Sequence, residues 1–181
     1  MTVLVTYASR HGATTGIATR IADTLTANGR DAVCTPIEDV DQLEEYDAVV
    51  IGSAAYLFHW LKPAVRFVHE HAVVLQDKPV WLFSSGPLGT AEVDDHGKDV
   101  RETTRPREWA ELVPLIRPRG DRVFFGAYHP ALPAVGLGER VVRRLSAKST
   151  TLPAGDFRDW GDVEAWAREI ATELAAYTKS A

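Results

Sequence analysis

Several features that identify common protein classes are scarce in this sequence. Cys34 is the only cysteine among 181 residues, so no internal disulfide can form, and this usage suits a reducing cytoplasm. No apolar run reaches the roughly 18 residues that a membrane span requires. The chain opens with a strand pattern where a secreted protein has a basic and then apolar leader. We therefore expect a soluble, cytoplasmic protein.

Positive charge and metal-ligand clusters are scarce as well. Lys and Arg number 20 against 25 Asp and Glu, a net charge of −5, and no basic stripe is interleaved with aromatic residues, so we expect no nucleic-acid partner. His69 and His71 are two positions apart and would point to different sides of a helix. Asp94, Asp95 and His96 have no second cluster of matching spacing. We expect no metal site.

The chain is rich in short apolar runs that alternate with helical patterns. With 45% hydrophobic and 25% charged residues it has the composition of one globular domain, residues 1–181. Runs rich in β-branched and aromatic residues predict five strands, at 3–7, 31–36, 48–51, 80–83 and 123–127. Apolar residues at helical spacing predict helices at 17–25, 61–75 and 163–177, and a basic helix is expected at 140–148. A further helix is expected to open at Pro106, to carry apolar residues from 109 to 116 and to end at Pro118.

Strands that alternate with helices imply an α/β fold with a parallel sheet and helices on both faces. We predict a doubly wound five-stranded sheet in the order 2-1-3-4-5, which places a ligand beyond the carboxyl edge between strands 1 and 3. Residues 90–104 have little apolar content. They predict a solvated, mobile excursion from the domain, with outer limits at about 89–107.

The turn after the first predicted strand has the chemistry of a phosphate site. It leads into a helix, so backbone N–H groups remain free at the positive end of the helix dipole, and Ser9 and Thr14 add hydroxyls on either side of Gly12. The turn lacks Gly-Lys-Ser/Thr, which excludes a nucleoside-triphosphate P-loop. Gly12 and Gly16 alone do not complete the dinucleotide-binding fingerprint either. An ordinary strand-to-helix turn with good capping residues is the alternative.

The spacing Tyr7-x-Ser9-x-x-Gly12-x-Thr14 resembles the phosphate loop of flavodoxin-like proteins, which holds the ribityl phosphate of FMN. The resemblance implies a flavodoxin-like fold and FMN as the cofactor, although a deazaflavin would need the same anchor. It implies a phosphate loop made of Ser9, Arg10, His11, Gly12, Ala13 and Thr14.

By their order, two later loops correspond to the ring-binding loops of flavodoxins. The first consists of Ser53, Ala54, Ala55, Tyr56, Leu57, Phe58, His59 and Trp60. Its aromatic side chains can stack on a flavin ring or pack against the next helix, and His59 is a candidate for proton transfer or an ordinary solvated histidine. The second consists of Ser84, Ser85, Gly86, Pro87, Leu88 and Gly89. It has no aromatic residue, so this side is open to a substrate unless Trp81 or Tyr128 covers it.

The loop variant Ser9-Arg10-His11-Gly12-Ala13-Thr14 is most similar to the flavodoxin-domain group that contains the bacterial menaquinone-dependent protoporphyrinogen dehydrogenases. The likeness extends to residues 46–53, the His59 region, the strand end at Gly126-Ala127, and Asp159-Trp160 followed by residues 166–171. It implies FMN binding and electron transfer to a quinone. The polar excursion departs from the more basic and apolar insertion of that group, so any membrane contact, through residues 131–137 and the arginines after them, is expected to be peripheral.

Three functions are therefore compared. The first is an FMN-dependent oxidoreductase that oxidises protoporphyrinogen or another reduced organic substrate with a quinone acceptor. The second is a flavodoxin-type electron carrier that docks a redox partner protein, and the third is a flavin-free binding domain of the same fold. Bound flavin separates the first two from the third, and turnover with a quinone separates the first from the second.

Overall fold

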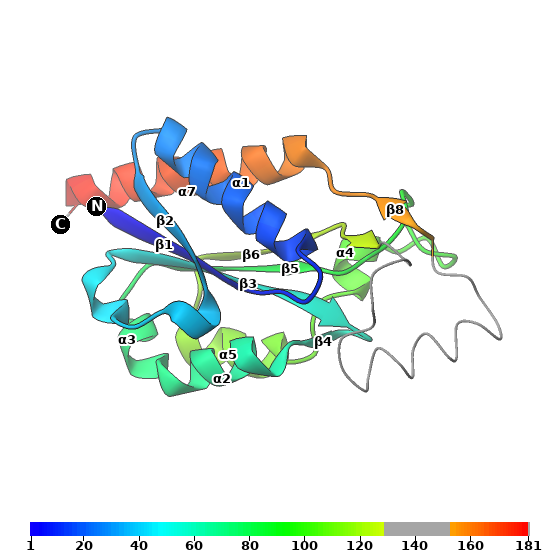
Figure 1. Ribbon diagram of the computed structural model, residues 1–181, viewed down its shortest axis with the longest axis horizontal. Helices are drawn as coiled ribbons and strands as arrows, with labels where there is room; N and C mark the ends of the chain where they lie inside the picture. Colours follow the sequence, from blue (N-terminus) through cyan, green and yellow to red (C-terminus); the bar gives the residue numbers. More distant parts are fainter. Residues whose placement is uncertain (129–152, 181) are drawn as a thin grey trace.

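The computed structural model describes residues 1–128 and 153–180, and a parallel sheet forms its centre (Figure 1). Its strands are β1 (Thr2–Ala8), β2 (Asp31–Pro36), β3 (Ala48–Tyr56), β5 (Val80–Ser85) and β6 (Gly120–Phe124). They lie in the order β2-β1-β3-β5-β6, and every neighbouring pair is parallel. Counted along the chain, this is the predicted order 2-1-3-4-5, so the doubly wound topology is confirmed.

Helices cover both faces of the sheet (Figure 1). Helices α1 (Ala13–Ala27) and α7 (Trp160–Ser180) lie on one face, and α2 (Lys62–Glu70), α3 (Ala72–Gln76) and α5 (Trp109–Ile116) lie on the other. Two short 3-10 helices, η1 (Ile37–Asp39) and η2 (Leu43–Glu45), lead from β2 to β3. Within residues 1–128 and 153–180, no helix combines the length and the apolar composition needed to cross a bilayer.

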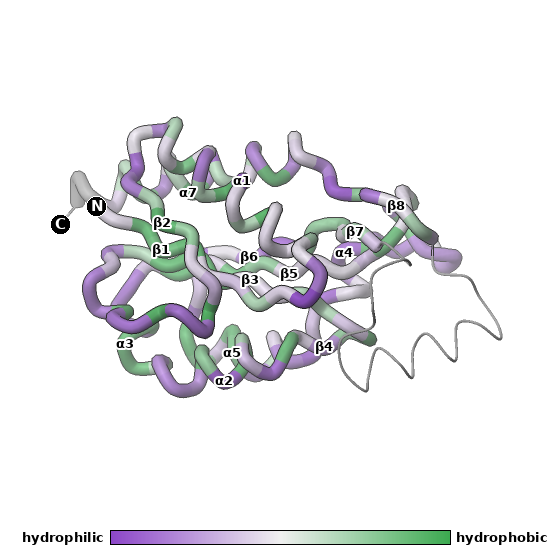
Figure 2. Tube along the Cα trace, in the orientation of Figure 1, coloured by the Kyte–Doolittle hydropathy of each residue, from purple (hydrophilic) through white to green (hydrophobic). Residues whose placement is uncertain are grey.

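Two cores, one on each face of the sheet, hold the layers together. Alternate side chains of a strand point to opposite faces. Val50 therefore packs with α1 and α7, whereas Val49 and Ile51 pack with α2, α3 and α5. All three are fully buried. Figure 2 shows the hydrophobic residues concentrated along the strands.

Some element boundaries differ from the sequence expectation. The strand expected at 48–51 continues to Tyr56, because β1 and β5 pair with β3 as far as Ser53 and Ala54, and residues 59–60 pair with its last two residues. The strand expected at 123–127 begins earlier, at Gly120, and ends at Phe124. The helix expected at 61–75 is divided into α2 and α3 at His71. The basic helix expected at 140–148 lies outside the described residues.

The polar excursion is anchored at its second half. Residues 90–92 and 95–99 are exposed, as expected for a solvated segment, and the short helix α4 (Val100–Thr103) follows. The Arg101 guanidinium lies 4.9 Å from the ring centre of Phe125 and 3.8 Å from Asp162. Arg105 forms a 2.7 Å ion pair with Asp121 of β6. These contacts fasten residues 100–105 to the domain, which the composition alone did not indicate.

Gly52 in β3 provides a test of the core. It lies beside Phe83 of β5, and a methyl group built on Gly52 would overlap the Phe83 ring. We expect Gly52→Ala to lower the free energy of unfolding by about 1–3 kcal/mol, the usual cost of overpacking a core. Urea unfolding measures this difference. Gly126→Ala is the control, because its methyl group would meet no atom within 3.4 Å and the nearest at 3.7 Å. Equal unfolding midpoints for the two variants would contradict this account of the core.

Candidate functional site

Three segments that follow β1, β3 and β5 meet at the carboxyl edge of the sheet. The hydroxyl oxygens of Thr14 and Ser85 are hydrogen-bonded at 2.9 Å, which joins the first segment to the third. The Arg10 guanidinium lies 4.9 Å from the centre of the Tyr56 ring, which joins the first to the second. A Cβ on Gly86 would lie 3.3 Å from that of Ala55, so the second and third are also in contact. The three segments therefore lie together at this edge, and that they share one ligand site stays a prediction.

The segment between β1 and α1 has the geometry of an anion site. Gly12 precedes α1 with φ of 82°, and its N–H donates to the Ser9 hydroxyl oxygen at 3.2 Å. No side chain of the described residues caps α1, and the first backbone bond of the helix runs from Gly16 N to Gly12 O. The N–H groups of residues 13–15 therefore have no partner within the helix. Among the described residues, no atom would lie within 4 Å of a Cβ on Gly12, so the space beside Gly12 at this end of α1 is open.

Thr14 has a structural contact that the sequence prediction did not include. Its side chain is buried, and its hydroxyl is used in the bond to Ser85 at the end of β5. Within the described residues the hydroxyl thus fixes the start of α1 against the sheet. The Thr14 backbone N–H remains one of the three groups at the open helix end.

The loop expected at 53–60 is a β-hairpin, which corrects the prediction. Strand β4 (His59–Trp60) pairs antiparallel with the end of β3, with Ala55 opposite Trp60 and Tyr56 opposite His59. Leu57 and Phe58 form the two-residue turn with φ of 51° and 66°. Positive φ at both positions is the geometry of tight hairpin turns, which favour Asn and Gly. Two bulky residues there are strained, so the sequence carried no recognisable hairpin signal.

Glu108 fastens this hairpin, and the sequence analysis missed it. One carboxylate oxygen accepts from His59 Nδ1 at 2.7 Å, and the other accepts from the Trp60 backbone N–H at 3.0 Å. The neighbouring Arg107 N–H donates to the Phe58 carbonyl oxygen at 2.9 Å. Nothing in the spacing of residues 49 positions apart could have indicated this pair. An acidic residue just before a predicted helix was the one available signal, and it is equally typical of a helix start.

The environment of Glu108 determines its ionisation. Burial by itself would raise the pKa of the Glu108 carboxyl, but the hydrogen bonds from His59 and from the Trp60 N–H favour the charged form more strongly. The net result is a pKa below its ordinary value of 4.5. An ionised carboxylate only accepts hydrogen bonds, so His59 must carry a proton on Nδ1.

The aromatic residues of the hairpin differ in position. Trp60 is only 3% exposed and packs edge-on against Trp109 with ring centres 5.6 Å apart, so its ring belongs to the core and not to the site surface. Tyr56 is half-buried beneath Arg10, and Phe58 is 43% exposed. Of the three predicted stacking residues, Trp60 is thus removed from the site surface, and Phe58 is the most exposed. Trp81 is buried against α1 and α7 and does not reach the site.

The segment after β5 is attached to the end of β6. Gly86 N donates to the Phe124 carbonyl oxygen at 3.3 Å, and Gly126 N donates to that of Pro87 at 2.8 Å. Ser84 is buried, and its hydroxyl has no hydrogen-bond partner within the described part of the chain. The Ser53 hydroxyl donates to the Ala54 carbonyl and accepts from Leu61 N, so it holds the base of the hairpin.

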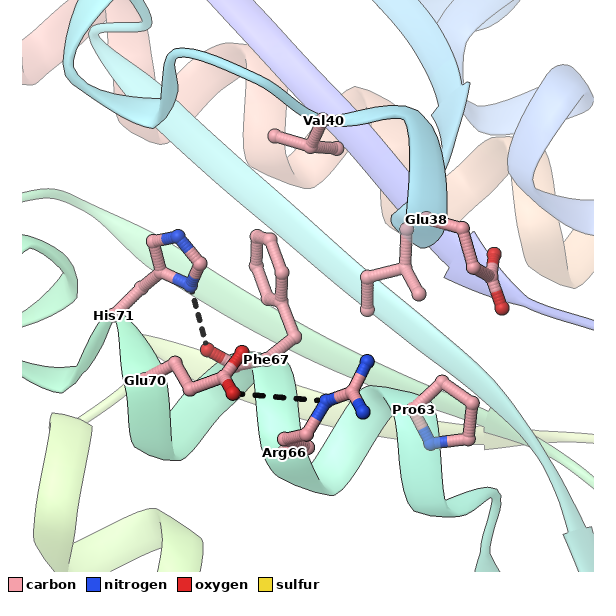
Figure 3. A pocket seen from close by; sticks show the side chains of 8 residues that line it. Glu38, Val40, Pro63, Arg66, Phe67, Glu70 and His71 are labelled. Carbon is pink, nitrogen blue, oxygen red and sulfur yellow. Dashed lines mark hydrogen bonds and ion pairs between the residues drawn. The ribbon is translucent and has the colours of Figure 1, made fainter.

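A separate hollow of about 190 Å³ lies between η1 and α2 (Figure 3). It is lined by Ile37, Glu38, Val40, Pro63, Arg66, Phe67, Glu70 and His71. None of the predicted site residues lines it. Arg66 is 3.6 Å from Glu70, and His71 Nδ1 donates to the Phe67 carbonyl at 2.9 Å. Elsewhere too, no three His, Cys, Asp or Glu side chains of the described residues are grouped to hold a metal ion.

A doubly wound sheet with an anion site after β1 and two further segments at the same switch point defines a flavodoxin-like domain. Residues 4–133 match the family model described as "Flavodoxin domain", and the chain belongs to this family. The family implies FMN as the cofactor. The N–H groups at the uncapped start of α1 have the chemistry to hold its phosphate, and the exposed Phe58 ring has the chemistry to stack on its ring.

Solved structures show the same fold. A mutant flavodoxin from Pseudomonas aeruginosa has a TM-score of 0.59 at 16% identity, with 97% of this chain and 99% of that chain covered. A flavodoxin from the domain Archaea has a TM-score of 0.50 at 19% identity, covering 83% and 96%. The rubredoxin oxygen:oxidoreductase from Desulfovibrio gigas has a TM-score of 0.57 at 14% identity, and the match spans 97% of this chain and 36% of that chain. No curated protein sequence matches the chain significantly.

The depressed pKa of Glu108 gives a prediction for stability against pH. Its contribution is present above the ordinary value of 4.5 and is lost as the pH falls through the lower folded value. We expect Glu108→Gln to destabilise the protein by about 1 kcal/mol at pH 7, and the difference from the wild type to shrink as the pH falls below the ordinary value of 4.5. Urea unfolding at several pH values measures it.

Glu111→Gln is the matched control for this measurement. Glu111 also pairs with a histidine, His69, at 3.4 Å, but its side chain is 69% exposed. Such a pair contributes little, so Glu111→Gln should leave the unfolding midpoint unchanged. A Glu108→Gln protein that behaves like Glu111→Gln at every pH would refute the role given to Glu108.

Proposed function

We propose that the protein is an FMN-dependent oxidoreductase that oxidises a reduced organic substrate and passes the electrons to a quinone. The observation that carries this proposal is an asymmetry in the site. The hairpin presents Tyr56 and Phe58, whereas Ser85 to Gly89 on the other side include no aromatic side chain. We propose that one face of a flavin ring is left open to a small substrate and that neither Trp81, which is buried, nor the half-buried Tyr128 covers it.

We propose protoporphyrinogen as the substrate to test first. The support is the sequence similarity of residues 9–14 and of Asp159-Trp160 to the menaquinone-dependent protoporphyrinogen dehydrogenases. We also propose that residues 1–181 form a single cytoplasmic domain with at most peripheral contact to a membrane that holds the quinone.

Each part of the site would have its own role. Ser9, Gly12 and the N–H groups of residues 13–15 would bind the phosphate, with Arg10 and His11 at the edge of the loop. Ala54, Ala55 and Gly86 have small side chains or none, which allows their backbone to approach the ring edge. Bound FMN would supply the two-electron acceptor for the substrate.

His59 is the residue that we assign to proton transfer. It lies opposite Tyr56 in the hairpin register, and paired residues of an antiparallel hairpin present their side chains on the same face. Since Nδ1 donates to Glu108, the neutral ring has an unprotonated Nε2 that can accept a proton, and the side chain is 51% exposed. His59 would take the proton that the substrate loses on oxidation.

An electron carrier is the second candidate. The flavodoxin from Pseudomonas aeruginosa matches over nearly the whole of both chains. Leu57 is 67% exposed beside Phe58 at the hairpin tip, and such a tip could meet a redox partner protein. A carrier needs no open ring face and no proton acceptor, so the features of the substrate side favour the enzyme.

The FMN site is tested by absorbance of the purified protein after FMN is added and the excess is removed. We expect a retained flavin spectrum in the wild type and at least a tenfold higher Kd in Ser9→Asp, because the new carboxylate repels the phosphate. Thr26→Asp places the same charge at the other end of α1 and should leave the Kd unchanged. A wild-type protein that retains no flavin would contradict both the oxidoreductase and the electron-carrier proposals.

Turnover separates the enzyme from the carrier. With FMN bound, we expect oxidation of protoporphyrinogen by a soluble menaquinone analogue, and a decrease in kcat of about 100-fold or more in His59→Gln with the Kd for FMN unchanged. Absence of turnover, together with rapid electron exchange with a redox protein, would favour the carrier. An unchanged kcat in His59→Gln would remove His59 from the mechanism.

A further inference from the structure

Arg158 connects the segment before α7 to the start of α1. Its Nε and Nη2 atoms donate to the two carboxylate oxygens of Asp156 at 2.7 and 2.5 Å, which fixes the plane of the guanidinium. Nη1 donates to the Ala13 carbonyl oxygen at 3.3 Å. The guanidinium also lies 4.5 Å from the ring centre of Trp160, and the side chain is 16% exposed.

Gly16 makes room for this contact. It lies within α1, where glycine costs up to about 1 kcal/mol relative to alanine. A Cβ on Gly16 would lie 2.5 Å from Arg158 Nη1, so any other residue would displace the guanidinium. The cost of a glycine in this helix is explained by the approach of Arg158.

The contact acts on the peptide group that faces the anion site. The Ala13 carbonyl and the Thr14 N–H belong to the same planar peptide unit and point in opposite directions. A cationic donor on the carbonyl therefore fixes the direction of the Thr14 N–H, and it polarises that N–H into a stronger donor. Thr14 N–H is one of the groups at the open end of α1.

The position of the charge also points to an anion. A cation near a helix N-terminus opposes the helix dipole, and here Asp156 offsets it within the unbound protein. A phosphate dianion at the end of α1 would interact favourably with both the helix end and the guanidinium.

We propose that Arg158 is a positioning residue for the phosphate loop and that it makes the site select flavins that carry a phosphate. The proposal rests on the FMN site of the proposed function. Arg158 acts through the Ala13–Thr14 peptide, so its removal should weaken recognition of the phosphate and leave recognition of the ring intact.

The test compares the Kd values of FMN and riboflavin, which has the same ring but no phosphate. We expect Arg158→Met to raise the Kd for FMN at least tenfold and that for riboflavin less than twofold. Gly16→Ala should give the same phosphate-selective loss, because it displaces a guanidinium that is still present. Compared with Arg158→Met, Arg158→Lys should restore part of the FMN affinity. The Lys ammonium can donate to the Ala13 carbonyl oxygen, but it cannot form the paired bonds to Asp156 that fix the guanidinium.

Arg20→Met is the matched control. Arg20 stacks on the same Trp160 ring at 5.1 Å and pairs with Glu164, but it lies further along α1. It should leave both Kd values unchanged. Equal losses of FMN and riboflavin affinity in Arg158→Met would show a purely structural residue and overturn the proposal, as would no loss at all.

A measurement without flavin separates this proposal from the proposed function. In the flavin-free protein, Arg158→Met should shift the amide nitrogen and proton NMR signals of Thr14, and Arg20→Met should not. If the wild type binds neither flavin, the proposed function fails, and titration with inorganic phosphate then tests Arg158. Weaker phosphate binding in Arg158→Met would support its role, and an unchanged Thr14 signal or unchanged phosphate binding would overturn it.

Discussion

Both faces of β3 are covered, and this constraint determines the rest of the fold. A central parallel strand that is apolar at successive positions needs a helical layer on each side. Val50 packs against α1 and α7, and Val49 and Ile51 pack against α2, α3 and α5 on the other face. Because the helical connections make all of these strands parallel, the carboxyl ends of β1, β3 and β5 lie at the same edge of the sheet. The candidate site is a consequence of that edge and not of any one motif.

The segments at this edge are held by residues from distant parts of the chain. Ser85 bonds to Thr14, Glu108 bonds to His59 and Trp60, and Arg158 bonds to Ala13. Groups fixed in this way lose little freedom when a ligand binds, so a larger share of each contact is available as affinity. The fold determines where the candidate site lies, and these four hydrogen bonds hold its segments in place.

The features that could be predicted from the sequence are those set by local residue patterns. The strand order followed from apolar runs such as 48–51 and from right-handed crossovers. The turn from β1 into α1 followed from Ser9, Gly12 and the helical pattern after them, and its role as a phosphate loop stays a prediction. Contacts between distant residues leave no periodic signal, so Glu108 and Arg158 were missed. The burial of Trp60 depends on Trp109, and the anchoring of the excursion depends on charge pairs with Asp121 and Asp162.

The turn of the hairpin has a consequence for the stability of the domain. Leu57 and Phe58 adopt a backbone conformation that costs about 1–3 kcal/mol at each bulky residue. Asn-Gly would adopt the same turn without this cost. Leu57 and Phe58 are 67% and 43% exposed, so burial of their side chains offsets little of this cost in the free domain. The hairpin tip therefore lowers the stability of the domain, and an exchange there is a simple route to raising it.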